Sequence, residues 1–254
     1  MHGICNLSII PLRALPDHKS EMVSQLLFGE YFSIQERFES WIKITLASDS
    51  YEGWIDQKQM TEISQEEFQL FQKSEKTSSQ EIFSKITFEN SILFIPMGSN
   101  LPYYNNGKFT IGNKIFNIHA GIEKQKFDKK KFIDKVFLFL ETPYLWGGKS
   151  VFGIDCSGFS QLIMAQFGIY LLRDAHQQAN QGQLVSFISE MKIGDLAFFD
   201  NNDGQIIHVG IILDNFQIIH AHGKVRIDSL DDMGIFNKKT GKHSHRLRFI
   251  KRYF

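Results

Sequence analysis

The chain is poor in cysteine, with only Cys5 and Cys156 among 254 residues. Small secreted domains are often held together by several disulfides, and two cysteines so far apart cannot form such a framework. The opening residues MHGICNLSIIPLR also lack a cationic stretch followed by a long apolar run, so they predict a strand and not a signal peptide. We therefore expect a reducing, cytoplasmic location.

Net charge and long hydrophobic runs are also missing. The 28 basic and 28 acidic side chains cancel, so the chain has no excess of positive charge that would favour binding to nucleic acid or to an anionic membrane. No stretch approaches the roughly 18 apolar residues of a membrane-spanning helix. We expect neither partner, whereas the oligomeric state is left open by the sequence.

Proline is scarce (5 residues) and phenylalanine abundant (24 residues), a mixture that suits compact β-rich cores. In residues 1–63, short runs of β-branched and aromatic residues alternate with Gly, Asn, Asp and Ser clusters, which predicts a small β-barrel. Residues 64–121 begin with Ser64 and Glu67 at the spacing of a helix capping box. Further short strands around the Asn-Asn-Gly turn at 105–107 predict a second small barrel.

The pattern changes in residues 122–254. Helical periodicity predicts one helix that ends before Pro143 and another that stops at Gly168. From Gly194 onward the runs GDLAFFD, IIHVGIILD, FQIIHAHG and HRLRFIKRYF predict strands. Helices followed by an antiparallel sheet define an α+β domain.

Cys156 lies where a loop becomes the second helix, in YLWGGKSVFGIDCSGFSQ. Unpaired N–H groups and the positive end of the helix dipole favour a thiolate at such a position. The same N–H groups suit a developing oxyanion. The sequence therefore predicts a nucleophile at Cys156.

Two histidines in the downstream strands supply the base that such a nucleophile needs. His208 and His220 are twelve residues apart, the spacing of neighbouring strands in a hairpin. A helix-borne cysteine packed against a strand-borne histidine, which a polar residue on the next strand orients, is the papain-like arrangement. We expect His208 to be the general base and His220 its orienter.

Plainer interpretations exist for each of these residues. A buried cysteine or histidine is often only part of a core, which is our interpretation of Cys5. The pair His220 and His222, together with His208 and Cys156, could also suggest a zinc site, but no CxxC or HExxH spacing exists, so we predict no metal and no cofactor. His243 and His245 lie in a basic stretch and are expected to be solvated.

The strings GIDCSGF, GDLAFF, HVGIIL and IIHAHG are together very similar to the NlpC-type peptidoglycan peptidases. With SEMVSQLLFGE and YEGWI in the first barrel, the whole chain resembles the γ-D-glutamyl-L-diamino acid endopeptidases of murein-peptide recycling (the dipeptidyl-peptidase VI type). The resemblance implies a papain-like catalytic domain at 122–254 behind two bacterial SH3-type barrels, at 1–63 and 64–121. It also implies cleavage of the γ-D-Glu–diamino acid bond in peptides with a free N-terminal L-Ala.

The same resemblance implies a set of substrate-binding residues. The counterparts of Asp155 and Ser157 hold the free ammonium, and Glu21 and Tyr51 resemble first-barrel residues that close the same pocket. Tyr144 and Trp146 would form an aromatic wall, and Asp174 resembles a residue at the diamino-acid end. The residue after Asp174 is Ala175, where the family tends to have a small polar residue, which weakens the match there.

The expected reaction is hydrolysis through a thioester on Cys156. Two alternatives stay open: an acyltransferase that uses the same thioester, and a non-catalytic wall-binding module. The sequence does not separate diaminopimelate from lysine as the third residue, because both present an amine there. The partner in either case is a murein peptide.

Overall fold

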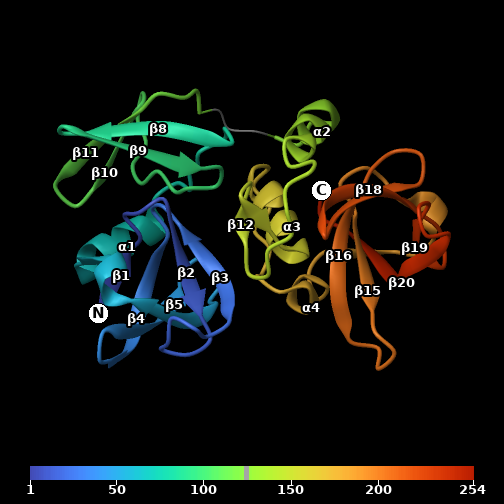
Figure 1. The fold of residues 1–254 in the computed structure, drawn as a ribbon. Coiled ribbons are helices and arrows are strands. Elements are labelled where there is room, and N and C mark those ends of the chain that lie inside the picture. Colours follow the sequence, from blue (N-terminus) through green and yellow to red (C-terminus); the bar gives the residue numbers. More distant parts are fainter. Residues whose placement is uncertain (123–125) are drawn as a thin grey trace. The chain divides into compact units, whose positions relative to one another are not determined.

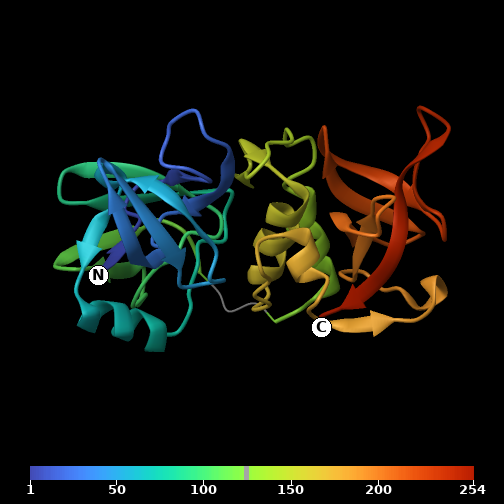
Figure 2. The same cartoon turned by 90° about the horizontal axis from the view of Figure 1, so that it is seen from below.

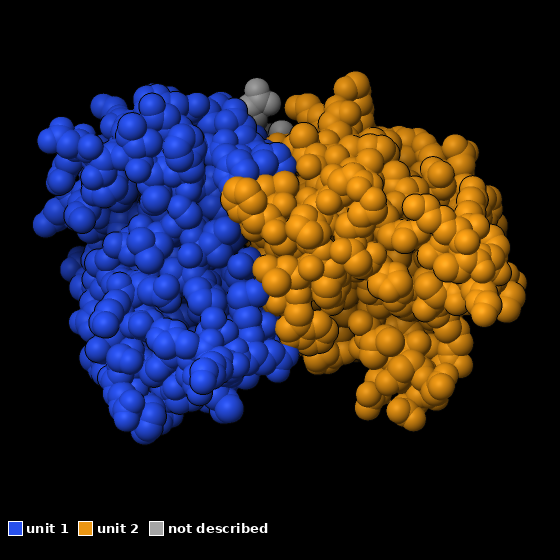
Figure 3. Space-filling view, viewed as in Figure 1, with its two compact units in different colours: residues 1–124 blue, residues 125–254 orange. Residues whose placement is uncertain are grey.

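The structure is a computed structural model that describes residues 1–122 and 126–254. The chain divides into two compact units, residues 1–124 and residues 125–254, which Figure 3 shows in different colours. No helix in the described residues has the length and apolarity that crossing a bilayer requires. Each unit has its own sheets and its own core.

The first unit opens with a seven-stranded antiparallel sheet in the order β3-β2-β6-β5-β4-β1-β7 (Figure 1). Alternating burial along the strands places one face on an apolar core that includes Cys5, Leu12 and Phe32. The strands are β1 (His2–Ile4), β2 (Ile9–Arg13), β3 (Met22–Leu27), β4 (Tyr31–Phe38), β5 (Trp41–Leu46), β6 (Glu52–Asp56) and β7 (Thr61–Ile63), with a short 3₁₀ turn at Gln57–Gln59. These are the SH3-like strands that the sequence predicted.

The rest of the first unit is a helix and a four-stranded sheet in the order β10-β11-β8-β9. A single core cluster joins Phe28, which directly follows β3, Phe68 and Phe71 of the helix and Phe109 of the second sheet. The elements are α1 (Gln65–Lys73), β8 (Phe83–Phe88), β9 (Ser91–Pro96), β10 (Lys108–Ile111) and β11 (Lys114–Ile118). The division of this unit at residues 63 and 64 stays a prediction.

Two local signals in this unit are confirmed. The Ser64 hydroxyl accepts from the Glu67 amide at 3.0 Å, and the Glu67 carboxylate accepts from the Ser64 amide, so the capping box is complete. Asn106 and Gly107 both have positive φ (47° and 80°), as the mirror-image hairpin turn ahead of β10 requires.

The second unit begins with helices. They are α2 (Lys129–Phe137), α3 (Cys156–Ala165) and α4 (Ala175–Gln178), with the two-residue strands β12 (Lys149–Ser150) and β13 (Gly153–Ile154) between the first two. The first helix ends earlier than predicted, because Glu141 takes φ of 70° and its amide donates to Val225 across the domain. The second ends at Ala165, three residues before the predicted stop, and Gly168 with φ of 80° turns the chain away from the helix.

The remaining strands form a seven-stranded antiparallel sheet in the order β14-β20-β15-β16-β17-β18-β19, and a further β19–β20 pairing closes six of them into a barrel (Figure 2). Closure pairs each of these six strands on both sides, and β14 stays outside the ring as an edge strand on β20. The strands are β14 (Gln183–Val185), β15 (Leu196–Asp200), β16 (Ile206–Ile212), β17 (Gln217–His222), β18 (Lys224–Leu230), β19 (Gly234–Asn237) and β20 (Lys242–Arg252); a 3₁₀ turn lies at Ile188–Glu190. Helix α3 packs against β16 and β17, and the α+β class is confirmed.

The packing beneath α3 can be tested at Phe159, which is 1% exposed and lies against Phe139 with ring centroids 5.7 Å apart. Phe159→Ala removes a fully buried ring, so we expect a loss of about 3–5 kcal/mol in the free energy of unfolding of the second unit. Calorimetry of the full chain would measure it. Phe187→Ala is the matched control, because Phe187 is 66% exposed; equal losses in both variants would contradict the packing of α3.

Candidate active site

Cys156 is the first residue of α3, and Asp155 caps that helix. The Asp155 Oδ1 accepts from the Gly158 amide at 2.6 Å, and Oδ2 accepts from the Gly147 amide at 2.8 Å. The Cys156 side chain is buried, at 8% exposure for the residue. The cap thus fixes the loop on one side and the first helical turn on the other, with the thiol between them.

The carboxylate of Asp155 is also half of a buried ion pair. Arg173 donates to both of its oxygens, at 3.1 Å and 2.6 Å, and to the Ser157 hydroxyl at 2.9 Å. Both side chains of the pair are almost fully buried, at 1% and 8% exposure. A buried pair with this two-point geometry is costly to break, because one charge would stay uncompensated.

The surroundings keep the thiol protonated. Burial, followed by the negative charge of Asp155, raises the pKa of Cys156 to about 12. Hydrogen bonds from the backbone amides of Val209 and Ser157, and the charge of Arg173, act in the opposite direction but are weaker. The helix start alone predicted a stabilised thiolate, and the structure shows that desolvation outweighs it.

The Val209 amide locates the thiol on the barrel. Val209 follows His208 on β16, so the sulfur of Cys156 lies at the His208–Val209 step of that strand. His208 is buried, and its Nε2 is hydrogen-bonded to Nδ1 of His220 at 2.8 Å. The second nitrogen of His208, Nδ1, is therefore the one left for the cysteine.

The hydrogen bonds continue beyond His220 to two residues that the sequence did not single out. Nε2 of His220 is 3.0 Å from Oδ2 of Asp228 on β18, and Arg226 donates to Oδ1 of the same carboxylate at 2.8 Å. Burial alone would raise the pKa of Asp228, but the bonds from His220 and Arg226 outweigh it and lower that pKa to about 2. The carboxylate is thus ionised and can only accept.

An ionised Asp228 assigns the proton positions along the chain of imidazoles. Its acceptor role requires the proton of His220 on Nε2, which makes Nδ1 of His220 an acceptor. Nε2 of His208 must then carry the proton of His208, and Nδ1 of His208 is left with a lone pair. The hydrogen-bonded chain His208–His220–Asp228 therefore prepares a base on the side of Cys156.

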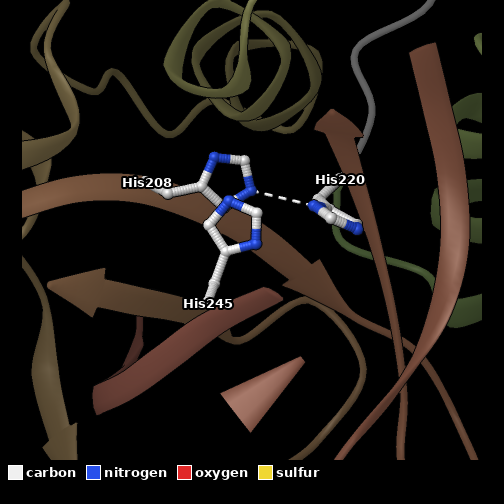
Figure 4. A group of neighbouring side chains, drawn as sticks. All are labelled: His208, His220 and His245. Carbon is white, nitrogen blue, oxygen red and sulfur yellow. Dashed lines mark hydrogen bonds between the residues drawn. The ribbon is translucent and has the colours of Figure 1, made fainter. Parts of the chain in front are cut away.

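His245 of β20 stacks on the ring of His208, with centroids 4.1 Å apart and an interplanar angle of 22° (Figure 4). The expectation that His245 is solvated is wrong, because the barrel turns this residue of β20 inward. His243, two residues earlier, is exposed and bonded to Asp231 at 2.9 Å. Burial lowers the pKa of His245 to about 4, with His220 and His222 adding to the effect.

His208 is also neutral. Burial lowers its pKa well below the usual value, and the neighbouring imidazoles of His245, His220 and His222 lower it further. The thiol of Cys156 and the imidazole of His208 are therefore both neutral in the free protein. The proton of Cys156 moves to His208 only when a change in the site favours the pair of a thiolate and an imidazolium over the neutral pair.

The remaining predicted residues of the second unit lie around the same helix start. Tyr144 is anchored by its amide to Gly223, and burial together with the charges of Cys156 and Asp155 raises its pKa, which places its hydroxyl near the thiol. Trp146 is 61% exposed. Asp174 is the residue before α4, and its amide donates to the Gln177 side chain at 3.0 Å.

Asp155 and Ser157 have structural partners that the sequence did not show. The Ser157 hydroxyl and both Asp155 oxygens are engaged with Arg173. Glu21, exposed just before β3, and Tyr51, partly buried against the first core, belong to the other unit. Their roles in substrate binding stay predictions.

Two segments of the chain match known protein families. Residues 141–244 match the model of the NlpC/P60 family, and residues 12–60 match the bacterial dipeptidyl-peptidase SH3 domain. The second unit carries an NlpC/P60 domain. A bacterial dipeptidyl-peptidase SH3 domain thus lies ahead of an NlpC/P60 cysteine-peptidase domain in this chain.

Relatives cover most of the chain. It is 29% identical over 216 residues to a gamma-D-glutamyl-L-lysine dipeptidyl-peptidase of Bacillus subtilis, covering 78% of this chain and 71% of the relative. It is 27% identical over 261 residues to dipeptidyl-peptidase 6 of Lysinibacillus sphaericus, covering 91% and 93%. A solved NlpC/P60 family protein from Bacillus cereus superposes with a TM-score of 0.84 at 19% identity, over 100% of this chain and 99% of that one, and shows the same fold.

The protonation of the thiol can be tested by alkylation. Because the pKa of Cys156 is raised to about 12, we expect its rate of reaction with iodoacetamide to keep rising from pH 7 to pH 10, following the thiolate fraction. Intact-protein mass spectrometry would follow the reaction. Cys156→Ala reports the contribution of Cys5, and a rate that levels off below pH 8 would instead indicate a thiolate–imidazolium pair in the free protein.

Proposed function

We propose that this peptidase hydrolyses the γ-D-glutamyl–diamino acid bond of murein peptides with a free N-terminal L-Ala, with Cys156 as nucleophile, His208 as base and His220 as orienter. The observation that carries the mechanism is the hydrogen-bonded chain His208–His220–Asp228 behind a cysteine at a helix start. The bond is proposed from the names of the relatives, which are dipeptidyl-peptidases of gamma-D-glutamyl-L-lysine.

The first half of the reaction forms a thioester. Nδ1 of His208 takes the proton of Cys156, and the sulfur attacks the γ-carbonyl carbon of D-glutamate. The negative charge moves to the carbonyl oxygen, next to the amides at the start of α3, which have no partner inside the helix. When the tetrahedral species collapses, the C–N bond breaks and His208 gives its proton to the leaving amine.

The second half restores the enzyme. His208 takes a proton from water as its oxygen attacks the thioester carbon, and the C–S bond then breaks with the thiolate of Cys156 as leaving group. His208 returns its proton to that sulfur, and the product departs with a free γ-carboxyl group, which ionises in water. Through both halves, His220 and Asp228 keep the proton of His208 on Nε2 whenever its Nδ1 must accept. Substrate in the site also displaces water, which strengthens the attraction between thiolate and imidazolium.

Specificity for a free N-terminus needs negative charge beside the ammonium of L-Ala. Asp155 is neutralised by Arg173 at close range, so its contribution to the binding of a cation is small. Glu21 is the other carboxylate that the sequence predicts for this task, with Tyr51 and Ser157 as polar partners. The murein-recycling role, the cytoplasmic location and the choice between lysine and diaminopimelate also stay predictions.

The direct test is mass spectrometry of L-Ala-γ-D-Glu-diaminopimelate, and of its lysine counterpart, after incubation with the protein. We expect release of L-Ala-D-Glu from the free peptides and not from the N-acetylated ones. Cys156→Ala should abolish turnover while the melting temperature is kept. Equal cleavage of the acetylated peptides would show that a free N-terminal ammonium is not required. Turnover by Cys156→Ala would show that Cys156 is not the nucleophile.

The role of the hydrogen-bonded chain can be tested at Asp228. An amide in Asp228→Asn can donate to Nε2 of His220, which reverses the proton positions and places a proton on Nδ1 of His208. We expect kcat to fall by a factor on the order of 10², with KM little changed, because a correctly protonated base is worth this much.

The matched control is Asp231→Asn. Asp231 also pairs with a histidine, His243, but on the outside of the barrel. Steady-state kinetics on the free peptide would compare both variants with the parent chain. A kcat that falls equally in both, or in neither, would show that Asp228 does not set the protonation of His208.

A further inference from the structure

Three imidazoles gather next to Cys156 from three different strands. They are His208 of β16, His220 of β17 and His245 of β20, and Figure 4 shows one nitrogen of each ring facing the space between them. One ligand nitrogen from each lies within 4.8 Å of the other two. Proton transfer from Cys156 requires only two of these rings, so the third has no role in the proposed hydrolysis.

We propose that His208, His220 and His245 form an inhibitory site for a divalent transition-metal ion such as Zn²⁺. Imidazole nitrogen suits zinc, copper and nickel, and three histidines with one open position form a common zinc ligand set. The sequence raised a zinc site with Cys156 as a ligand and gave no reason to keep it, because the histidines follow no metal-binding spacing; His245, 25 positions after His220, was not among the candidates.

The geometry needs only a small adjustment. Zinc–nitrogen bonds of about 2.0–2.1 Å in a tetrahedron separate the ligand nitrogens by about 3.3 Å. Nε2 of His208 and Nδ1 of His220 are now 2.8 Å apart and would move slightly away from each other. The ligand nitrogen of His245 lies within 4.8 Å of the other two, and His245 would tilt out of its stack on His208 to bring it closer.

The surroundings of His220 already resemble those of a metal ligand. Histidines that bind metals usually donate their other N–H to a carboxylate, which fixes the ring and makes the ligating nitrogen more basic. Nε2 of His220 has this arrangement with Asp228 at 3.0 Å, leaving Nδ1 for the metal. His222 stands beside the group, with its ring centroid 4.8 Å from that of His245.

Metal binding at this place would stop the proposed reaction for a definite reason. A cation on Nε2 of His208 displaces the proton from that nitrogen, and the neutral ring then carries its proton on Nδ1. Nδ1 is the atom that would accept the proton of Cys156. The inhibition depends on the proposed function, whereas the metal site depends only on the three imidazoles.

The binding test uses the full-length Cys156→Ala chain, in which the thiol cannot serve as a ligand. Zn²⁺ is titrated in competition with a chromophoric chelator, and we expect one ion per chain. Adding His245→Phe keeps an aromatic ring in the stack but removes a ligand, so the affinity should fall at least about tenfold. His243→Phe on the same strand is the matched control and should leave the affinity unchanged.

The absorption spectrum of the Co²⁺ form provides a second measurement that does not need the His245 variant to fold. Tetrahedral d–d bands without a sulfur-to-cobalt charge-transfer band, in both the parent chain and Cys156→Ala, are expected for an imidazole site. Loss of binding in Cys156→Ala would overturn the proposal in favour of a thiol ligand. Equal zinc affinity of the Cys156→Ala chain with and without His245→Phe would overturn the proposal as well.

The inhibitory role is tested separately on the active chain. Zn²⁺ should inhibit peptide cleavage at the concentration at which it binds, and a chelator should restore the activity. Binding without inhibition would reject the inhibitory role and leave the metal site in place. A chain with no peptidase activity would count against the proposed function, and the zinc titration would still decide the site.

Discussion

The buried pair of Asp155 and Arg173 is the interaction on which the rest of the catalytic unit depends. The Asp155 carboxylate caps α3 by accepting from the Gly158 amide, and it holds the preceding loop by accepting from the Gly147 amide. It also accepts from the two terminal nitrogens of the Arg173 guanidinium. Its removal would leave an uncompensated buried charge and release the helix start at once. The position of Cys156 is therefore a consequence of this pair more than of α3 alone.

The closed barrel supplies the other half of the site. Adjacent antiparallel strands bring His220 on β17 next to His208 on β16 and Asp228 on β18 next to His220. The barrel also turns His245 of β20 onto the ring of His208. Because one continuous sheet carries all four side chains, their spacing is set by backbone pairing and not by flexible loops, which suits a site that must hold protons at defined atoms.

Burial has a double effect on this chemistry. It raises the pKa of the thiol and lowers the pKa of the imidazoles, so the free protein stores its nucleophile and base as a neutral pair. The same low-dielectric surroundings strengthen any charge separation that a bound substrate induces. Neutral imidazoles are also the form that binds metal ions. The proposed reaction needs the lone pair of His208 on Nδ1 and the proposed inhibition needs it on Nε2, so the two require opposite tautomers of the same ring.

The sequence by itself determined the helix start at Cys156, the two strand-borne histidines and the α+β order of elements, because each follows from local spacing or periodicity. The capping box at Ser64 and the turn at Asn106 were predictable for the same reason. Only the tertiary structure decided that Asp228 completes the hydrogen-bonded chain, that Asp155 is neutralised by Arg173 and that His245 lies on His208. The Asp155–Arg173 pair joins two loops ahead of α3 and α4, and the other contacts join strands whose pairing is set by barrel closure. The alternation of Leu247 and Phe249 with Arg246 and Arg248 indicates the inward face of β20, but only the strand pairing decides that His245 meets His208 there.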